Sequence, residues 1–313
     1  MSDELIVFTH NDLDALGCML NLEFKFPNIK KKYFHTNYAN IVDLTDQILD
    51  YQKENGNTHI VMPDVSFSDN KESLRRIYEA FPHCTHIDHH LYADGFWDEF
   101  PNMKVVYNKD KCATLLCNEY LGNKGQNENL DKLSFLIDIY DLWQDDTPYF
   151  DAAQDLNDYF WEVDIEWLKN DIVKGNFKLP RNYKEIVEKT HNIRMKAIDG
   201  YEKRNLIHRA GDITVAFVQD WFNHILISEM RKGKNYVIGV NSYGIVKVRI
   251  NQQGPATPQQ LNQLRLELTG TENIGHMLAF TYKIKGQVDF NVIMAEVKKV
   301  TEAIQRICNE NRK

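Results

Sequence analysis

Short apolar runs alternate with helical patterns over the first 110 residues of the chain. Leu5–Phe8 is a continuous apolar run, which is typical of a strand covered on both faces. Similar runs follow, and between them apolar residues recur at the spacing of an amphipathic helix. The alternation predicts βαβ units around a parallel sheet. The other predicted strands are Lys32–Thr36, Thr58–Met62, Thr85–Asp88 and Lys104–Tyr107, and the predicted helices are Ala15–Phe24, Ile41–Tyr51 and Ser68–Phe81, the last capped by Ser68 or Asp69.

The middle of the chain has a helical pattern from Ala113 to about Leu168. Its three tryptophans, Trp143, Trp161 and Trp167, are interpreted as core residues. The pattern breaks at Gly175–Pro180, and a charged helical stretch from Tyr183 to Leu206 follows. Because this stretch lacks a wide apolar face, we interpret it as a connector between two domains.

Beyond residue 210 the rhythm changes again. Tyr236–Asn241 and Gly244–Asn251 predict a hairpin that turns at Ser242-Tyr243. A strand at Asp212–Val218 and helices at Ile225–Arg231 and Pro258–Leu268 are also predicted, and a stripe of Ile293, Val297, Val300, Ile304 and Ile307 predicts a last helix. The predicted fold class is therefore α/β. An N-terminal parallel-sheet domain is expected at 1–175, a helical connector at 176–210 and a smaller C-terminal α/β domain at 211–313.

The length of 313 residues is that of two ordinary domains. The net charge of −8 argues against a protein that grips long nucleic acid along an extended basic face. The charge is uneven, because residues 211–313 carry 13 Lys and Arg against 9 Asp and Glu, whereas 1–210 carry 24 against 36. An acidic half can supply carboxylates to cations and a mildly basic half can meet an anionic substrate, although solvated helix faces alone could give the same distribution.

The cysteines and the N-terminus indicate a cytoplasmic protein. The five cysteines (Cys18, Cys84, Cys112, Cys117 and Cys308) are scattered and form no C-x-x-C pair, so we expect reduced, buried thiols. The chain opens with acidic rather than basic residues, which argues against a secretory signal. No apolar stretch approaches the roughly 18 residues that span a bilayer, so no membrane contact is expected. The sequence leaves the oligomeric state open, a homodimer included.

Four segments carry metal-ligand side chains at points where strands or helices give way to loops. They contain His10, Asp12 and Asp14 after the first strand, Asp64 after the third, Asp88, His89 and His90 after the fourth, and Asp141 at the end of a helical run, with Asp138 one turn earlier as an alternative. Because the carboxyl ends of parallel strands face one crevice, the first three segments can converge. Taken alone, a carboxylate after a strand is more often a helix cap or a turn former, and Asp14 or Asp64 could be just that.

Together, the four segments are a stronger signal than each one alone. Their mixture of carboxylates and imidazoles suits manganese, magnesium or iron better than a thiolate-bound structural zinc. The number of ligands is sufficient for two ions. Such a pair can activate a water and stabilise an in-line displacement at phosphorus.

These motifs resemble those of the DHH phosphoesterase family. The family includes RecJ-type exonucleases, nanoRNase-type enzymes that degrade short oligonucleotides, cyclic-dinucleotide phosphodiesterases and manganese-dependent inorganic pyrophosphatases. Asp88-His89-His90 matches the naming motif, residues 10–17 resemble the first motif, and Asp64 and Asp141 resemble the second and fourth. The resemblance covers about residues 5–145, and Gly270–Phe280 is similar to the Gly-rich, His-containing loop of the DHH-associated domain.

The resemblance implies two divalent metal ions, Mn²⁺ with Mg²⁺ as the alternative, and a role for each residue. One ion is expected on His10, Asp12 and Asp64, and the other on Asp14, Asp64, His89 and Asp141, with Asp64 bridging. His90 is expected to contact the substrate phosphate or to assist proton transfer to the leaving oxygen, while Asp88 orients an imidazole.

In the second domain, the resemblance implies that His276 and the Gly275 backbone contact a phosphate or the terminal nucleotide. Arg249, expected to be exposed at a strand end, is a candidate phosphate clamp because a guanidinium binds phosphate bidentately. A solvated arginine with no such role is the equal alternative.

The leading functional hypothesis is a metal-dependent phosphodiesterase, an exonuclease that hydrolyses short oligonucleotides or dinucleotides to mononucleotides. The modest positive charge of the second domain favours short substrates, because long ones need several Lys or Arg contacts. The alternative in the same class is a phosphodiesterase for cyclic dinucleotides. An inorganic pyrophosphatase and a nucleotide-binding module without turnover rank lower, the former because the first motif has the spacing His-x-Asp-x-Asp, the latter because every expected ligand is present.

Overall fold

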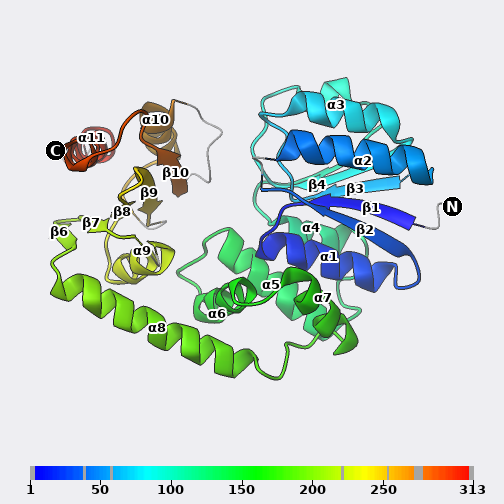
Figure 1. The fold of residues 1–313 in the computed structure, drawn as a ribbon, viewed down its shortest axis with the longest axis horizontal. Helices are drawn as coiled ribbons and strands as arrows, with labels where there is room; N and C mark the ends of the chain where they lie inside the picture. The colour runs from blue at the N-terminus through cyan, green and yellow to red at the C-terminus, as the bar shows by residue number, and fades with distance from the viewer. Residues whose placement is uncertain are drawn as a thin grey trace. The chain divides into compact units, whose positions relative to one another are not determined.

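The computed structural model of the chain describes residues 4–37, 40–56, 59–219, 222–251, 254–270 and 278–309. They form two compact units, Met1–Val187 and Glu188–Lys313, and each unit contains one five-stranded sheet (Figure 1). The unit boundary falls within helix α8 (Tyr183–Lys203). No helix among the described residues is both long enough and apolar enough to cross a membrane. The predicted α/β fold class, with a parallel sheet followed by a second sheet, is confirmed.

The sheet of the first unit is fully parallel, in the order β2-β1-β3-β4-β5. Its strands are β1 (Glu4–Thr9), β2 (Lys30–His35), β3 (His59–Pro63), β4 (His83–Asp88) and β5 (Lys104–Tyr107), each within a few residues of the predicted one. Helices α2 (Ile41–Asn55) and α3 (Lys71–Ala80) cover one face, and α1 (Leu13–Lys25) and α4 (Ala113–Tyr120) cover the other (Figure 1). Because both faces are covered, the middle of the sheet is buried: all six residues of β1 are buried, and four of them in a row, Leu5–Phe8, are apolar.

The predicted cap of α3 is wrong. The helix begins at Lys71 after Asn70, which makes no side-chain capping bond. The hydroxyl of Ser68 lies 3.1 Å from that of Ser66, and the Asn70 amide donates to the Phe67 carbonyl at 3.0 Å. The polar residues that the sequence offers as caps therefore form a turn before the helix.

The helical region after β5 consists of four short helices. They are α4, α5 (Glu128–Asp141), α6 (Phe150–Trp161) and α7 (Ile165–Lys174). The prediction that Trp161 and Trp167 are core residues is wrong, because they are 61% and 45% exposed. Their neighbours Phe160 and Leu168 take the core positions, and one step along a helix turns the next side chain by about 100° toward solvent. Trp143 is partly buried against Tyr140 and Phe150.

The sheet of the second unit is mixed, in the order β10-β9-β8-β7-β6. Its strands are β6 (Ile207–Ala210), β7 (Ile213–Phe217), β8 (Tyr236–Val240), β9 (Ile245–Ile250) and β10 (Ala279–Lys283). The predicted hairpin is confirmed, since β8 and β9 pair antiparallel. The edge strands β6 and β10 escaped prediction because each buries a single residue and so lacks a regular apolar alternation.

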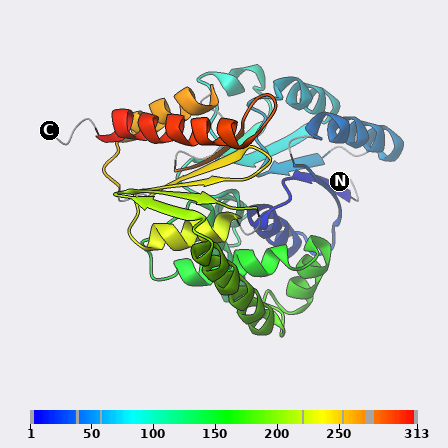
Figure 2. The same ribbon diagram turned by 60° about the vertical axis from the view of Figure 1, so that its left-hand side comes forward.

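Helices cover both faces of this second sheet. α10 (Pro258–Thr269) and α11 (Phe290–Asn309) lie side by side on one face, and α9 (Phe222–Arg231) and the end of α8 pack on the other (Figure 2). α10 carries a capping box, in which Thr257 and Gln260 bond to each other's backbone.

Gly17 sets the distance between α1 and α4. A Cβ atom at this position would lie 2.1 Å from Thr114 Oγ1 and 2.7 Å from Ile137 Cδ1, so only glycine allows the two helices to pack this closely. The Thr114 hydroxyl donates to the carbonyl of Asp14 at 2.7 Å. The close packing thus positions the start of α1, where the first predicted metal ligands lie.

Gly17→Ala is expected to destabilise the chain relative to Gly200→Ala by about 1–3 kcal/mol, the usual penalty for overpacking. Gly200 is the matched control because it is also helical and a Cβ there meets nothing within 4 Å. The gain in helix propensity, about 1 kcal/mol, is the same for both changes and cancels. Urea unfolding measures the difference, and equal stabilisation by both variants would disprove the packing constraint.

Candidate metal centre

The order of the first sheet brings three of the four predicted segments to one edge. β1, β3 and β4 are consecutive neighbours, and their carboxyl ends lead directly into His10, Asp64 and His89. The fourth segment does not follow a strand of this sheet, because Asp141 is the last residue of α5. The convergence expected from the sequence is therefore present in the structure.

Ligand atoms gather in three overlapping groups, in each of which they lie within 4.8 Å of one another. The groups are His10, Asp12 and Asp64; Asp14, His89 and Asp141; and Asp64, Asp88, His89 and His90. Asp64 and His89 each belong to two groups. The Nε2 atom of His89 lies 3.7 Å from Asp14 Oδ2, 3.7 Å from Asp64 Oδ1 and 3.4 Å from Asp141 Oδ2.

Asp14 is held by the N-terminus of α4. Its Oδ2 accepts from the Ala113 amide at 2.8 Å, and its Oδ1 accepts from the Thr114 amide at 2.7 Å. The positive end of the helix dipole stabilises a carboxylate at this position. Asp14 is 2% exposed, so these amides are what keep its charge tolerable inside the protein.

Asp12 serves as a helix cap and also faces His10. Its Oδ1 accepts from the Ala15 amide at 3.0 Å and caps α1, and its Oδ2 lies 2.7 Å from His10 Nδ1. Burial alone would raise the pKa of Asp12, but the hydrogen bond and charge of His10 and the Ala15 amide outweigh burial and hold this pKa well below its usual value. His35, at the end of β2, places its Nδ1 3.2 Å from the His10 carbonyl and so steadies the same loop.

Asp64 occupies the most demanding position of the set. Its backbone is in the left-handed region, with φ at 54°, which costs a non-glycine residue about 1–3 kcal/mol. Its amide donates to the Ile87 carbonyl at 3.0 Å, which ties this turn to β4. Burial, followed by the charges of Asp12, Asp14, Asp141 and Asp88, raises the pKa of Asp64 well above its usual value.

Asp141, not Asp138, extends toward the other ligands. Both oxygens of Asp138 are engaged, accepting from the Cys112 amide at 2.8 Å and from Gln144 Nε2 at 3.1 Å. Burial, and then the charges of Asp14 and Asp12, raise the pKa of Asp141 well above its usual value. Asp138 therefore fixes the start of α4, whereas Asp141 joins the group of Asp14 and His89.

The donor set fits divalent cations. Within the described part of the chain, the buried oxygens Asp64 Oδ2 and Asp141 Oδ2 have no hydrogen-bond partner. Buried carboxylate oxygens without donors are costly, and like charges this close repel. Hard cations that prefer oxygen ligands with some imidazole would satisfy these oxygens and offset the repulsion.

Asp88 is directed away from a ligand role by its own hydrogen bonds. Its Oδ1 accepts from the His89 amide at 2.8 Å and lies 2.7 Å from His90 Nδ1, and its Oδ2 accepts from the Tyr92 hydroxyl. Burial opposes the charge on Asp88, but His90 above all outweighs burial and lowers the pKa of Asp88. Tyr92 was missed from the sequence, because nothing in its spacing marks where its hydroxyl points.

In the second unit, two cationic side chains lie on β9. Arg249 and Lys247 alternate along the strand and therefore point to the same face of the sheet, opposite the buried Val246 and Val248. Arg249 is half-buried rather than exposed as predicted, and Lys247 was not singled out from the sequence. Burial, and then the charge of Arg249, lower the pKa of Lys247 to about 8. The other predicted substrate contacts, Gly275 and His276, lie outside the described residues.

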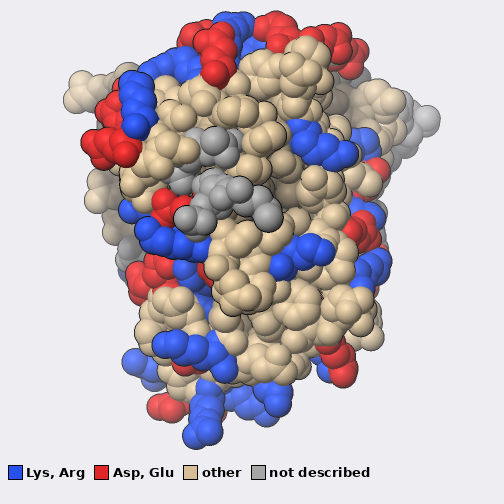
Figure 3. Space-filling view, turned by 90° about the vertical axis from the view of Figure 1, so that its right-hand side faces the viewer, with Lys and Arg blue, Asp and Glu red and all other residues tan. Residues whose placement is uncertain are grey.

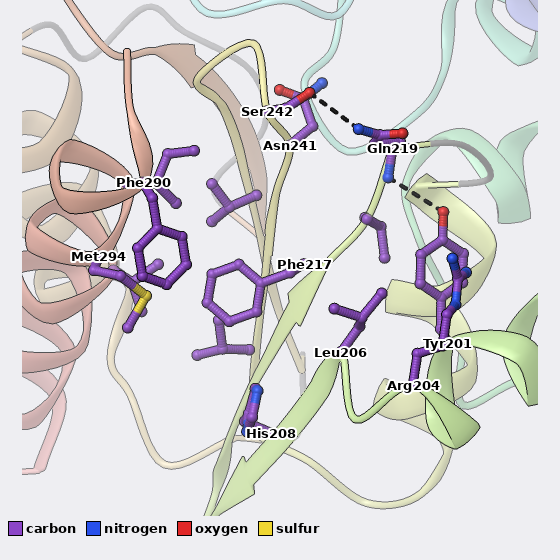
Figure 4. Close-up of a pocket in the computed structure, with 15 residues that line it drawn as sticks. Tyr201, Arg204, Leu206, His208, Phe217, Gln219, Asn241, Ser242, Phe290 and Met294 are labelled. Atoms are coloured by element: carbon purple, nitrogen blue, oxygen red, sulfur yellow. Dashed lines mark hydrogen bonds between the residues drawn. The ribbon is translucent and has the colours of Figure 1, made fainter.

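A pocket of about 740 Å³ lies elsewhere in the second unit, between α11 and the end of α8 (Figure 4). Its walls are apolar and include Leu206, Phe217, Phe290 and Met294. One end is polar, where the Gln219 side-chain amide donates to the Ser242 hydroxyl at 3.3 Å. None of the described site residues predicted from the sequence lines it. Its lining contains no carboxylate, and the candidate metal-ligand groups found among the described residues all lie in the first unit.

No family model and no curated protein matches the sequence. Solved structures do match. Exonuclease RecJ bound to manganese is similar with a TM-score of 0.56 at 15% identity, over 96% of this chain and 90% of that one. The pGpG-specific phosphodiesterase PggH from Vibrio cholerae gives 0.55 at 14% identity, over 96% and 98%. RecJ in complex with Mn²⁺ from Thermus thermophilus gives 0.56 at 14% identity over 96% of this chain, which spans only 52% of that protein.

These likenesses extend over both units of the chain, because each of the three covers 96% of it. RecJ-type exonucleases are among the proteins whose motifs the sequence resembles. At these identities the comparison shows the fold. The chain therefore has the RecJ-like fold that its DHH motifs predict.

Proposed function

We propose that the chain is a DHH-family phosphodiesterase that uses two divalent metal ions, Mn²⁺ or alternatively Mg²⁺, to hydrolyse short oligonucleotides to mononucleotides. The observation that carries the proposal is the convergence of Asp14, Asp64 and Asp141 on His89, with two buried carboxylate oxygens that accept no hydrogen bond in the described structure. The RecJ-like fold supports the same class of reaction.

The proposed ligands follow the geometry of the three groups. One ion would be held by His10, Asp12 and Asp64. The other would be held by Asp14, Asp64, His89 and Asp141, so that Asp64 would bind both ions. Bound as a pair, the ions would supply the activation of water and the neutralisation of charge that an in-line displacement at phosphorus requires. His90, oriented by Asp88, would contact the phosphate or donate a proton to the leaving oxygen.

Two observations favour short substrates. The chain has a net charge of −8, and on the one face drawn in Figure 3 the Lys and Arg side chains are scattered among acidic and uncharged residues rather than gathered into a stripe. A long nucleic acid needs such a stripe, because each phosphate contact takes a Lys or an Arg. The similar PggH is specific for pGpG, by its formula a linear dinucleotide, which favours substrates of that size.

The decisive experiment is incubation of the chain with manganese and a panel of labelled dinucleotides, longer oligomers, cyclic dinucleotides and pyrophosphate. Linear dinucleotides and short oligomers are expected to be cleaved fastest. Preferential cleavage of cyclic dinucleotides would support the alternative in the same class. Cleavage of pyrophosphate alone, or of no substrate, would overturn the proposal.

Asp64→Asn is expected to remove manganese-dependent hydrolysis, with a loss of activity of more than about 100-fold. Mutation of a residue that only orients a metal ligand already lowers metal affinity or activity by about 10- to 100-fold, and Asp64 is itself a proposed ligand. The metal-free variant should fold at least as stably as the wild type, because the amide removes one of several crowded negative charges. Manganese at about 100 times its dissociation constant stabilises a binding protein by about 2.7 kcal/mol, and the variant should lose this gain. Melting curves with and without manganese measure it.

The matched control is Asp146→Asn, the same change at an exposed position in the loop after α5. It should keep both the turnover and the stabilisation by manganese. Comparable effects of the two substitutions would mean that Asp64 has no special role.

Replacing His89 and replacing His90 should have different effects on metal binding. His89→Ala should lower manganese content, because its Nε2 faces three carboxylates, whereas His90→Ala should keep the metal and lose turnover. Elemental analysis of the two purified variants, alongside their rates, separates the roles. Equal loss of metal in both would contradict the assignment.

We propose that Lys247, beside Arg249 on β9, helps to bind the anionic substrate, so that binding should weaken as the pH rises through about 8. Lys247, with its pKa lowered to about 8, is charged below that pH and neutral above it, so its attraction for a phosphate is lost between about pH 7 and about pH 9. The expected rise in KM is on the order of 10-fold. Lys247→Arg keeps its charge throughout, and its KM should therefore stay flat. An identical rise in that variant would assign the effect to another group.

A further inference from the structure

The hydroxyl of Tyr92 joins the end of β4 to one of the loops that build the metal centre. It donates to Asp88 Oδ2, on the last residue of β4. It also accepts from the Phe67 amide at 3.4 Å and lies 3.3 Å from the Val65 carbonyl, both in the loop that follows Asp64. His86 reinforces the same junction, since its Nε2 lies 2.9 Å from the Val65 carbonyl.

The ring of Tyr92 is held in place by other aromatic side chains. Its centroid lies 4.7 Å from that of Phe96, 4.6 Å from that of Trp97 and 6.0 Å from that of Tyr107. Phe96 is buried, and Trp97 in turn packs on His86 at 4.9 Å. A side chain packed on several sides keeps one rotamer, so the Tyr92 hydroxyl is held within hydrogen-bond distance of Asp88 Oδ2.

Asp88 passes this constraint to His90. The carboxylate is fully buried, and its two oxygens divide their contacts: Oδ2 takes the Tyr92 hydroxyl, while Oδ1 takes His90 Nδ1 at 2.7 Å. The His89 amide holds Oδ1 at 2.8 Å and the Tyr92 hydroxyl holds Oδ2, so the two bonds together fix the plane of the carboxylate and the direction of Oδ1. Because Nδ1 of His90 is engaged with Asp88, contact or proton exchange with a substrate falls to Nε2.

We propose that Tyr92 is a positioning residue for the hydrolysis, acting through Asp88 to aim the His90 imidazole at the substrate phosphate. The proposal rests on the proposed function and adds to it a residue outside the DHH motif. Within the described part of the chain, the Tyr92 hydroxyl contacts Asp88 and the backbone of the loop after Asp64 rather than a proposed metal-ligand side chain. Its contribution lies in the orientation of His90, and carboxylate–imidazole pairs of this kind depend on such outer contacts.

The test is a double-mutant cycle with Tyr92→Phe and His90→Ala, assayed with a dinucleotide and manganese. Tyr92→Phe removes only the hydroxyl, so kcat should fall about 10- to 100-fold while KM and manganese content stay unchanged. The double variant should turn over no more slowly than His90→Ala alone, because the hydroxyl has nothing left to orient. The residual rates are measured at high enzyme concentration.

The matched control is Tyr107→Phe, which removes the hydroxyl of the neighbouring ring, for which the structure gives no hydrogen bond to Asp88. It should keep wild-type kcat, and melting curves of both variants show whether either one unfolds. Full activity of Tyr92→Phe would overturn the proposal, and so would a loss that adds completely to that of His90→Ala or that follows a loss of manganese. Failure of the proposed function is distinct, because the wild type would then cleave no phosphodiester in the first place.

Discussion

Repulsion among buried carboxylates is the constraint around which the first unit is organised. Asp14 and Asp64 are each 2% exposed, and Asp12 and Asp141 lie close enough to raise the pKa of Asp64 further. Such charges are tolerated inside a protein only when hydrogen bonds or cations compensate them. Three features hold the acids in one arrangement. Gly17 lets α1 pack closely on α4, the first amide of α4 donates to Asp14, and the backbone of Asp64 is held in a strained conformation.

The compensation is unequal among the acids, and the difference indicates which oxygens could bind cations. Asp12, Asp14 and Asp88 each receive backbone amides, from Ala15, from the start of α4 and from His89 respectively. The Oδ2 atoms of Asp64 and Asp141 accept no hydrogen bond among the described residues, although His89 Nε2 lies 3.4 Å from that of Asp141. A protein that buried these acids for stability alone would satisfy all of them. We infer that the acids with hydrogen bonds hold the surrounding loops and helix ends in place, and that the oxygens without hydrogen bonds are the ones that could bind a metal.

Most of the fold was predictable because the first sheet is buried on both faces. Continuous apolar runs such as Leu5–Phe8 mark its strands, and their neighbours in space follow from βαβ connections. The edge strands β6 and β10 were not predictable, since each buries one residue and resembles a loop. The exposed Trp161 shows a second limit, because composition favours a large aromatic in the core while its neighbour Phe160 takes that position.

The candidate site was predictable where its chemistry lies in residue type, and unpredictable where it lies in direction. Spacing and strand ends point to His10, Asp64, His89 and Asp141, but cannot tell Asp141 from Asp138 one turn earlier. That choice depends on the Cys112 amide and Gln144, which engage Asp138 from another helix and a loop. The same holds for Lys247, whose pKa is set by burial on a strand face that no linear pattern reveals. A sequence read alone therefore recovers the atoms that can bind a metal, and the contacts around those atoms decide which of them are turned toward it.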